Sequence, residues 1–173
     1  MDILAREARV LQIIKDELQA IRLLALRQPV ASDLRDTLGA LKISVDLERI
    51  GDLAKNVAKR AIVVSREVTD QNLVQGLVRM GRLSLTPLTN VLDAYSRRDE
   101  NAAMTVWKCD DEIDEIYNSL FRELLTYMME DPRNISLCTH LLFGAKNMER
   151  IGDHATNIAE EIYFMVKIGR AHV

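Results

Sequence analysis

Apolar residues recur every three or four positions along nearly the whole chain, the spacing that places them on one face of an α-helix. Interruptions are few, since the 173 residues include only seven Gly and three Pro. We expect a kink or break near Pro87, because proline cannot continue the helical hydrogen bonding. Five helices are predicted, at about 2–27, 33–66, 69–97, 99–130 and from the turn at 131–134 to about 166. Such long helices favour an all-α fold, an elongated antiparallel helical bundle.

An eleven-residue segment occurs twice in the chain. Glu48–Ala58 and Glu149–Ala159 lie 101 residues apart and are identical at eight of their eleven positions. Chance does not produce such agreement, so the chain contains a duplicated unit. Two predicted helices precede the second copy within its unit and only one precedes the first. We therefore expect a tandem repeat of three-helix units, with two helices in residues 1–68 and three in residues 69–167. By this interpretation the first helix of the first unit is missing and the chain is truncated at its N-terminus.

The missing helix has a consequence for the surface. The predicted helix 2–27 carries an apolar stripe that a third helix would cover, at Ile14, Leu18, Ile21 and Ala25. We expect an apolar groove to stay open along this helix and the helix at 33–66. At the other end, residues 168–173 break the helical pattern, and one possible coding of them matches a common sequencing-library adapter. This tail is therefore predicted to be non-native, and His172 receives no functional weight.

Composition narrows the class of protein. A net charge of −3 with no basic run argues against a nucleic-acid partner. No apolar stretch reaches the eighteen residues that a membrane span needs, and the first twenty residues are amphipathic, so we predict a cytoplasmic protein. Cys109 and Cys138 form no C-x-x-C pair and lie on separate predicted helices. Reduced core thiols are the expected state of both cysteines.

Each copy of the repeat carries a Glu, an Asp and an Asn at intervals of four, which places them on one side of the helix. These residues are Glu48, Asp52 and Asn56 in the first copy and Glu149, Asp153 and Asn157 in the second. Stacked like charges are mildly destabilising without a cation. A solvated face is the ordinary explanation of a single E-x-x-x-D motif, but it gives no reason for keeping the motif in both copies. Gly51 and Gly152 indicate the close approach of a ligand or a neighbouring helix.

Hairpin geometry predicts which acids face the second copy. Counted from Pro132, Asp114 lies 18 residues before and Glu149 lies 17 after, while Asp110 lies 22 before and Asp153 lies 21 after. Four carboxylates then converge, which is costly unless positive charge is present. Such oxygen ligands suit magnesium, manganese or iron, and carboxylates also bind zinc. The alternative is a polar seam without metal, in which the carboxyl pKa values are raised.

The first copy has a weaker counterpart. Counted from Pro29, the facing stretch of helix 2–27 offers only Glu7 at a suitable level for Glu48 and Asp52. The first-half site is therefore expected to be incomplete.

The chain resembles the PhoU family of phosphate-signalling proteins, which are built from two three-helix bundles in tandem. The segments that carry the resemblance are Leu23–Arg35, Asp46–Asp52, Asp110–Asp114, Phe121–Pro132 and Met148–Asn157. The resemblance implies that the E/D-x-x-x-D acids hold metal clusters. Here those acids are Glu48, Asp52, Asp110, Asp114, Glu149 and Asp153, with Asn56 and Asn157 as further ligands.

The resemblance also implies a role that no residue pattern shows. Family members are cytoplasmic adaptors, usually homodimers, that repress phosphate-starvation signalling and restrain phosphate uptake. The implied partners are the ATPase subunit of the phosphate ABC transporter and the phosphate-sensing histidine kinase. The adaptor is expected to contact the membrane only through these two proteins. We accordingly expect a regulator and not an enzyme.

Two other classes of protein are compatible with a helical bundle rich in acids. A di-iron carboxylate protein requires E-x-x-H on two helices, and the three histidines supply none. A metal-dependent phosphohydrolase requires an open coordination position and a general acid or base. His154, beside Asp153, is the single candidate for that acid or base.

Overall fold

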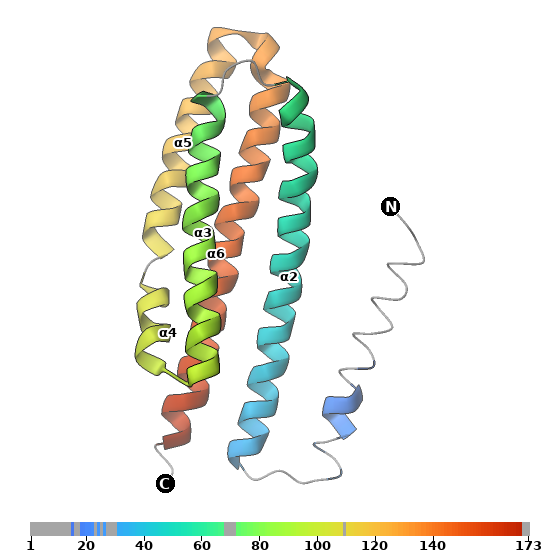
Figure 1. Ribbon diagram of the computed structural model, residues 1–173, viewed down its shortest axis with the longest axis vertical. Coiled ribbons are helices and arrows are strands. Elements are labelled where there is room, and N and C mark those ends of the chain that lie inside the picture. Colours follow the sequence, from blue (N-terminus) through green and yellow to red (C-terminus); the bar gives the residue numbers. More distant parts are fainter. Residues whose placement is uncertain are drawn as a thin grey trace.

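The computed structural model describes residues 15, 18–22, 24, 26, 31–67, 72–108 and 110–170. Within these ranges the side chains of residues 31, 32, 67, 72, 73, 110, 111 and 168–170 are left out of the description. The helices are α2 (Ala31–Glu67), α3 (Asn72–Arg97), α4 (Glu100–Trp107), α5 (Asp110–Glu130), the 3₁₀ turn η1 (Pro132–Asn134) and α6 (Ile135–Arg170). No strand occurs in the described ranges, and the long helices run side by side along one axis (Figure 1). The all-α helical bundle is confirmed.

Helix α2 agrees closely with the predicted helix at 33–66, and the other bounds show three differences. The predicted helix at 99–130 is wrong, because the chain forms α4 and α5 with a turn at Lys108. The sequence has neither Gly nor Pro at this break. The residues that usually mark the end of a helix therefore gave no signal of it. Asp99 accepts hydrogen bonds from the backbone N–H groups of Asn101 and Ala102 and so caps the start of α4.

The second difference concerns Pro87: of the kink or break predicted there, the break is wrong, because α3 continues through the proline. Proline removes one backbone hydrogen bond. Met80 and Val91, which lie on either side of it, are both fully buried in the core. Packing on both sides of the proline therefore keeps the two halves of α3 in one helix.

The third difference is at the C-terminal end. Helix α6 continues to Arg170, four residues beyond its predicted end at 166, and so includes the first half of the proposed tail. Residues 171–173 lie outside the described residues. The proposed origin of the tail stays a prediction.

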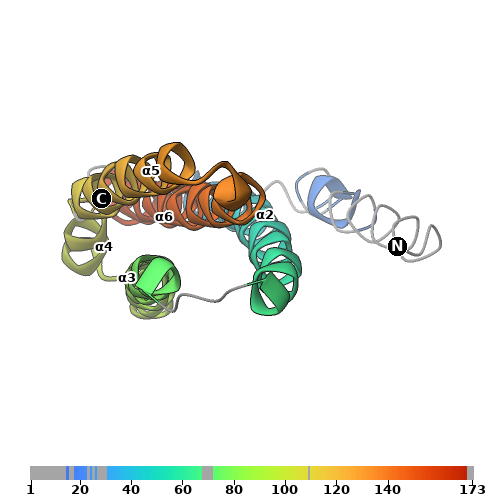
Figure 2. The same ribbon diagram turned by 90° about the horizontal axis from the view of Figure 1, so that it is seen from above.

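Helix α6 is the centre of the bundle. Helices α2, α3, α4 and α5 all pack against it, and the view along the bundle shows them arranged around it (Figure 2). The most extensive of these contacts joins α6 to α2, the two helices that carry the duplicated segment. The repeat therefore forms the spine of the structure.

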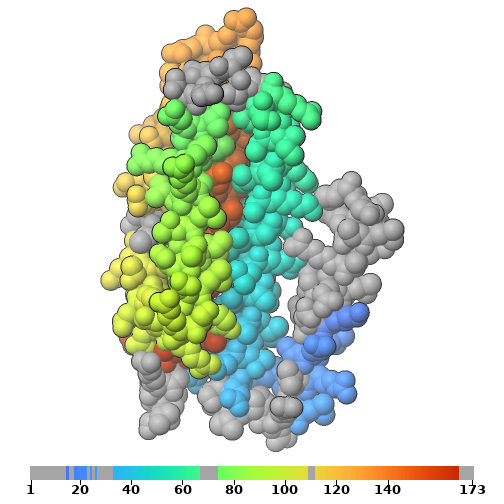
Figure 3. All heavy atoms as spheres, in the orientation of Figure 1, coloured from blue at the N-terminus to red at the C-terminus, as the bar shows by residue number. Residues whose placement is uncertain are grey.

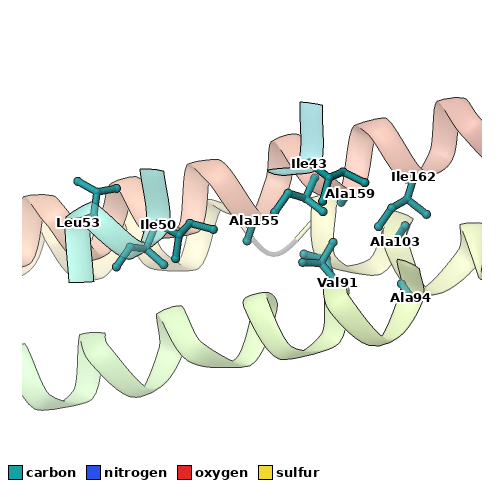
Figure 4. Packing of buried hydrophobic residues seen from close by; sticks show 12 residues of the cluster. Ile43, Ile50, Leu53, Val91, Ala94, Ala103, Ala155, Ala159 and Ile162 are labelled. Atoms are coloured by element: carbon teal, nitrogen blue, oxygen red, sulfur yellow. The ribbon is translucent and has the colours of Figure 1, made fainter. Parts of the chain in front are cut away.

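Two hydrophobic clusters run along this spine. The larger cluster combines residues of α2, α3, α4 and α6 and is shown in Figure 4. Its buried members are Ile43, Ile50, Leu53, Val91, Ala94, Ala103, Val106, Ile151, Ala155, Ile158, Ala159 and Ile162. The smaller cluster lies between α5, α6, α3 and the end of α2, around Met80, Leu124 and Leu141. The two predicted units thus share core residues through α2 and α6.

Cys138 belongs to the smaller cluster as a free, buried thiol, as predicted. Burial raises the pKa of this thiol above its usual value. A thiol with a raised pKa in an apolar site is unreactive. Cys109 lies outside the described residues.

The expected exposure of helix 2–27 is seen at the residues that are described. Leu18 and Ile21 are both exposed. Ile14 and Ala25, the other residues of that stripe, lie outside the described residues.

The core predicts a clear contrast between two isoleucines. Ile158→Ala should lower the free energy of unfolding by about 2–5 kcal/mol, because it leaves a cavity at a residue that is 0% exposed. Ile62→Ala removes the same atoms at a residue that is 57% exposed and should change the free energy by less than about 0.5 kcal/mol. Urea unfolding followed by circular dichroism measures both. Equal losses for the two variants would contradict the central position of α6.

Candidate metal centre

The α5–α6 hairpin brings three of the predicted acids together. Asp114 on α5 and Glu149 and Asp153 on α6 each offer one carboxylate oxygen, and these oxygens lie within 4.8 Å of one another. That spacing allows one ion to contact all three carboxylates. The arrangement agrees with the register obtained by counting from Pro132.

The turn between the two helices fixes this register. Asp131 caps η1 by accepting a hydrogen bond of 3.0 Å from the backbone N–H of Arg133. The Arg133 side chain also pairs with the Asp131 carboxylate at 2.8 Å. These hydrogen bonds hold the pKa of Asp131 below its usual value. This short turn and the core that α5 and α6 share set the register of the two helices.

Glu149 is the most buried of the three acids, with 9% of its surface exposed. Asp153 is half-buried and Asp114 is exposed, so the site opens toward solvent on the α5 side. The Oε2 atom of Glu149 is buried and has no hydrogen-bond partner. An unsatisfied buried oxygen is costly, and more so when it carries charge. A cation bound to this oxygen would supply the missing partner.

Lys146 supplies positive charge at the edge of the cluster. Its ammonium group forms a short ion pair with Oε1 of Glu149, one turn along α6, and lies 5.1 Å from the centre of the Tyr117 ring. The hydrogen bond to Glu149 raises the pKa of Lys146. The lysine therefore compensates part of the negative charge and would compete with any metal ion for Glu149. The sequence analysis missed this residue, although its i, i+3 spacing from Glu149 is a recognised signal for an ion pair.

Two further predicted ligands are less defined. Asp110 is the first residue of α5, and its side chain lies outside the described ones. Asn157 lies one turn beyond Asp153 on α6 and is exposed. Their contribution to a metal site stays a prediction.

The first copy of the motif lies in a different environment. Glu48 is half-buried, and Asp52 and Asn56 are exposed on α2. Among the described side chains, no third acid, histidine or cysteine completes a group of three with Glu48 and Asp52. Glu7, the predicted partner, lies outside the described residues.

His154 connects α6 to α2 instead of standing free beside the acids. Its Nδ1 lies 2.8 Å from Oδ1 of Asp46, and both side chains are largely buried. The position of the first copy that is equivalent to His154 is Leu53, so the first copy has no histidine for such a contact. The geometry accounts for His154 as a link between the two helices.

Fold and site together define a class: an all-helical bundle with an internal repeat whose second copy presents clustered carboxylates. The sequence profile of the PhoU domain matches residues 2–61 and 77–162. The chain therefore belongs to the PhoU family.

Curated relatives and solved structures agree with this assignment. The chain is 58% identical over 147 residues to the phosphate-specific transport system accessory protein PhoU homolog of Rhizobium meliloti, covering 85% of this chain and 62% of the relative. The homolog from Caulobacter vibrioides is 58% identical over 148 residues, covering 86% and 64%. The chain thus spans less than two thirds of the length of these relatives.

Two crystal structures share the fold. PhoU from Pseudomonas aeruginosa has a TM-score of 0.84 and 39% identity, with 95% of this chain and 81% of that chain covered. The regulatory protein PhoU of the Streptococcus pneumoniae phosphate transport system has a TM-score of 0.74 and 30% identity, with 93% and 80% covered. Within the described part of the chain, the helices contain no stretch long and apolar enough to cross a membrane.

The position of Lys146 leads to a prediction about metal affinity. Lys146→Met removes the cation that competes for Glu149 and should tighten the binding of a divalent metal about fivefold, or roughly 1 kcal/mol for a partly exposed pair. Lys42→Met is the matched control, because Lys42 pairs with Glu161 of α6 at 3.0 Å and forms no part of the cluster. Calorimetric titration with manganese measures both affinities. Equal changes in the two variants would contradict the proposed competition.

Proposed function

We propose that this chain is a metal-binding adaptor that regulates phosphate uptake and represses phosphate-starvation signalling. The single observation that supports metal binding is the convergence of Asp114, Glu149 and Asp153, of which Glu149 has a buried carboxylate oxygen without a hydrogen-bond partner. The names of its relatives, which describe accessory proteins of a phosphate-specific transport system, support the regulatory role.

The donor set determines which ions are suitable. Carboxylate oxygens bind hard cations such as magnesium, manganese and iron, and they also bind zinc. In our proposal Asp110 supplies the fourth carboxylate and Asn157 an amide oxygen at the second-half site. Glu48, Asp52 and Asn56 form the corresponding half of a second site, which needs a further acid facing α2. A bound cation offsets the repulsion between the acids and thereby holds α5 against α6.

The adaptor role involves two partners. We propose that the chain, as a cytoplasmic homodimer, contacts the ATPase subunit of the phosphate ABC transporter and the phosphate-sensing histidine kinase. Contact with the membrane then occurs only through these proteins, and nucleic acid has no part in the function. The proposed role is regulatory and involves no catalysis.

Removal of one carboxylate tests the metal site. Asp153→Ala should lower the metal content after chelation and reloading and leave the helical content unchanged, because the apolar face of α6 is untouched. Asp93→Ala is the control, since Asp93 is an exposed acid of α3 outside the cluster. Elemental analysis and circular dichroism give the two readouts. Equal metal content in the wild type and both variants would exclude the site.

A binding experiment tests the adaptor role separately. The purified 173-residue chain should form a complex with the ATPase subunit of the Rhizobium meliloti phosphate transporter, detected by biolayer interferometry. The ATPase subunit of an unrelated ABC transporter is the control and should not bind. If neither this subunit nor the matching histidine kinase binds, the proposed role is wrong, whatever the outcome of the metal analysis.

A further inference from the structure

The two copies of the repeat differ at one charged position beside the acids. Lys146 precedes Glu149 by three residues in the second copy, and the equivalent residue of the first copy, 101 positions earlier, is Val45. The acids of the second copy form a group of three with Asp114 of α5, and among the described side chains those of the first copy form no such group. The lysine therefore occurs in the copy whose acids converge.

The Lys146 ammonium group lies among several partners. It pairs with Oε1 of Glu149 and lies 5.1 Å from the centre of the Tyr117 ring on α5. The pKa of Lys146 is raised, mainly by the hydrogen bond to Glu149 and further by the nearby charge of Asp153. The chain thus places a positive charge of its own beside the clustered carboxylates.

A divalent cation held by the three acids would meet this ammonium group at close range. The three carboxylate oxygens lie within 4.8 Å of one another, so an ion that contacts all of them also contacts Glu149, the partner of Lys146. Repulsion between charges of +2 and +1 at such a range exceeds the small stabilisation that a partly exposed ion pair provides. The ammonium group and the ion are therefore expected to exclude each other.

Lys146 can move without disturbing the core. Its side chain is 47% exposed, whereas that of Glu149 is only 11% exposed, and its charge lies on a flexible stem of four carbons. Another side of α6 faces the hollow between α2 and α3, where atoms of α6 are visible in Figure 3, and contributes Gly144 and Met148 there. Lys146 is not among the described residues that line this hollow, so its movement leaves that side of the bundle unchanged.

We propose that Lys146 is a displaceable internal cation of the metal centre. In the metal-free protein its ammonium group holds Glu149, and it leaves both Glu149 and the Tyr117 ring when a divalent cation binds. Lysine pairs with Oε1 only and leaves the buried Oε2 without a hydrogen-bond partner, so a metal ion is the better occupant of this carboxylate. This inference rests on the metal site of the proposed function.

The exchange gives the centre two states. Without metal, Lys146 offsets part of the repulsion between the acids, so they stay together. With metal, the ammonium group moves into solvent and the face of the Tyr117 ring is uncovered. The ring of Phe121, which is itself partly exposed, lies next to it with 6.3 Å between the ring centres. Metal occupancy thereby changes both the charge and the apolar area of the surface that α5 and α6 share.

Amine labelling of the 173-residue chain measures the state of Lys146. The chain is acetylated with and without saturating manganese, and mass spectrometry gives the rate at each lysine. The rate at Lys146 should rise about fivefold with manganese, since a partly exposed ion pair protects the amine only to this degree. Lys42 is the internal control, because it pairs with Glu161 at 3.0 Å and lies 5.8 Å from the centre of the Phe164 ring, outside the cluster. Its rate should stay unchanged.

Three variants identify the partners in the exchange. Glu149→Gln should give Lys146 the higher rate even without manganese. Glu161→Gln is the matched control and should raise the rate at Lys42 alone. Asp153→Ala, which removes one acid of the centre, should abolish the response of Lys146 to manganese. Circular dichroism checks that each variant keeps its fold.

Calorimetric titration of the wild type with manganese separates the ways in which the inference can fail. If manganese binds and the rate at Lys146 does not change, the lysine stays on Oε1 while the ion uses Oε2 of Glu149. That result would overturn the exchange and leave the metal site intact. No binding of manganese would overturn the exchange and the metal site together. A response that Asp153→Ala retains would place the ion elsewhere and also overturn the exchange.

Discussion

The packing of α6 on several sides at once is the constraint on which the rest of the structure depends. Four helices pack against it, and from Leu137 to Ile162 it contributes buried residues to both hydrophobic clusters. Buried apolar area stabilises by roughly 25 cal/mol per Å², so a helix that contributes to both clusters supplies a large share of the stability of this small bundle. A change in α6 therefore affects every neighbour, whereas a change on the outer face of α2 affects few.

This constraint also determines where the acids of α6 lie. Ile151, Ala155 and Ile158 are needed in the core, which leaves Glu149 and Asp153 on the side that faces α5. The capped turn at Asp131 then brings Asp114 level with them. Carboxylates in such a place repel each other, so nearby positive charge stabilises them. Lys146 provides part of it within the chain. The clustered acids are thus a consequence of hydrophobic packing.

Much of this arrangement could be predicted from local sequence, because it depends on helical spacing and one short turn. The bounds of α2 and the level of Asp114 against Glu149 are examples, since each follows from counting residues along a regular helix. The break between α4 and α5 could not be predicted, because Lys108 lies in a stretch without Gly or Pro. The contact between His154 and Asp46 was also inaccessible, since it joins residues 108 apart and depends on how α2 crosses α6. Prediction failed for a helix end that no Gly or Pro marks and for a contact that depends on how two helices cross.

The duplicated segment shows why a motif alone does not define its surroundings. Ile50 and Ile151 are equivalent, and both are buried at the contact between α2 and α6. Ala54 and Ala155 are also equivalent, yet the first is exposed and the second is fully buried. Both copies keep small residues on this side although only one copy has a helix on it within the described chain. Small side chains expose little apolar area, so an uncovered alanine stripe costs far less than an uncovered leucine stripe would. The repeat can therefore leave this side of one copy exposed without losing the core that holds both copies together.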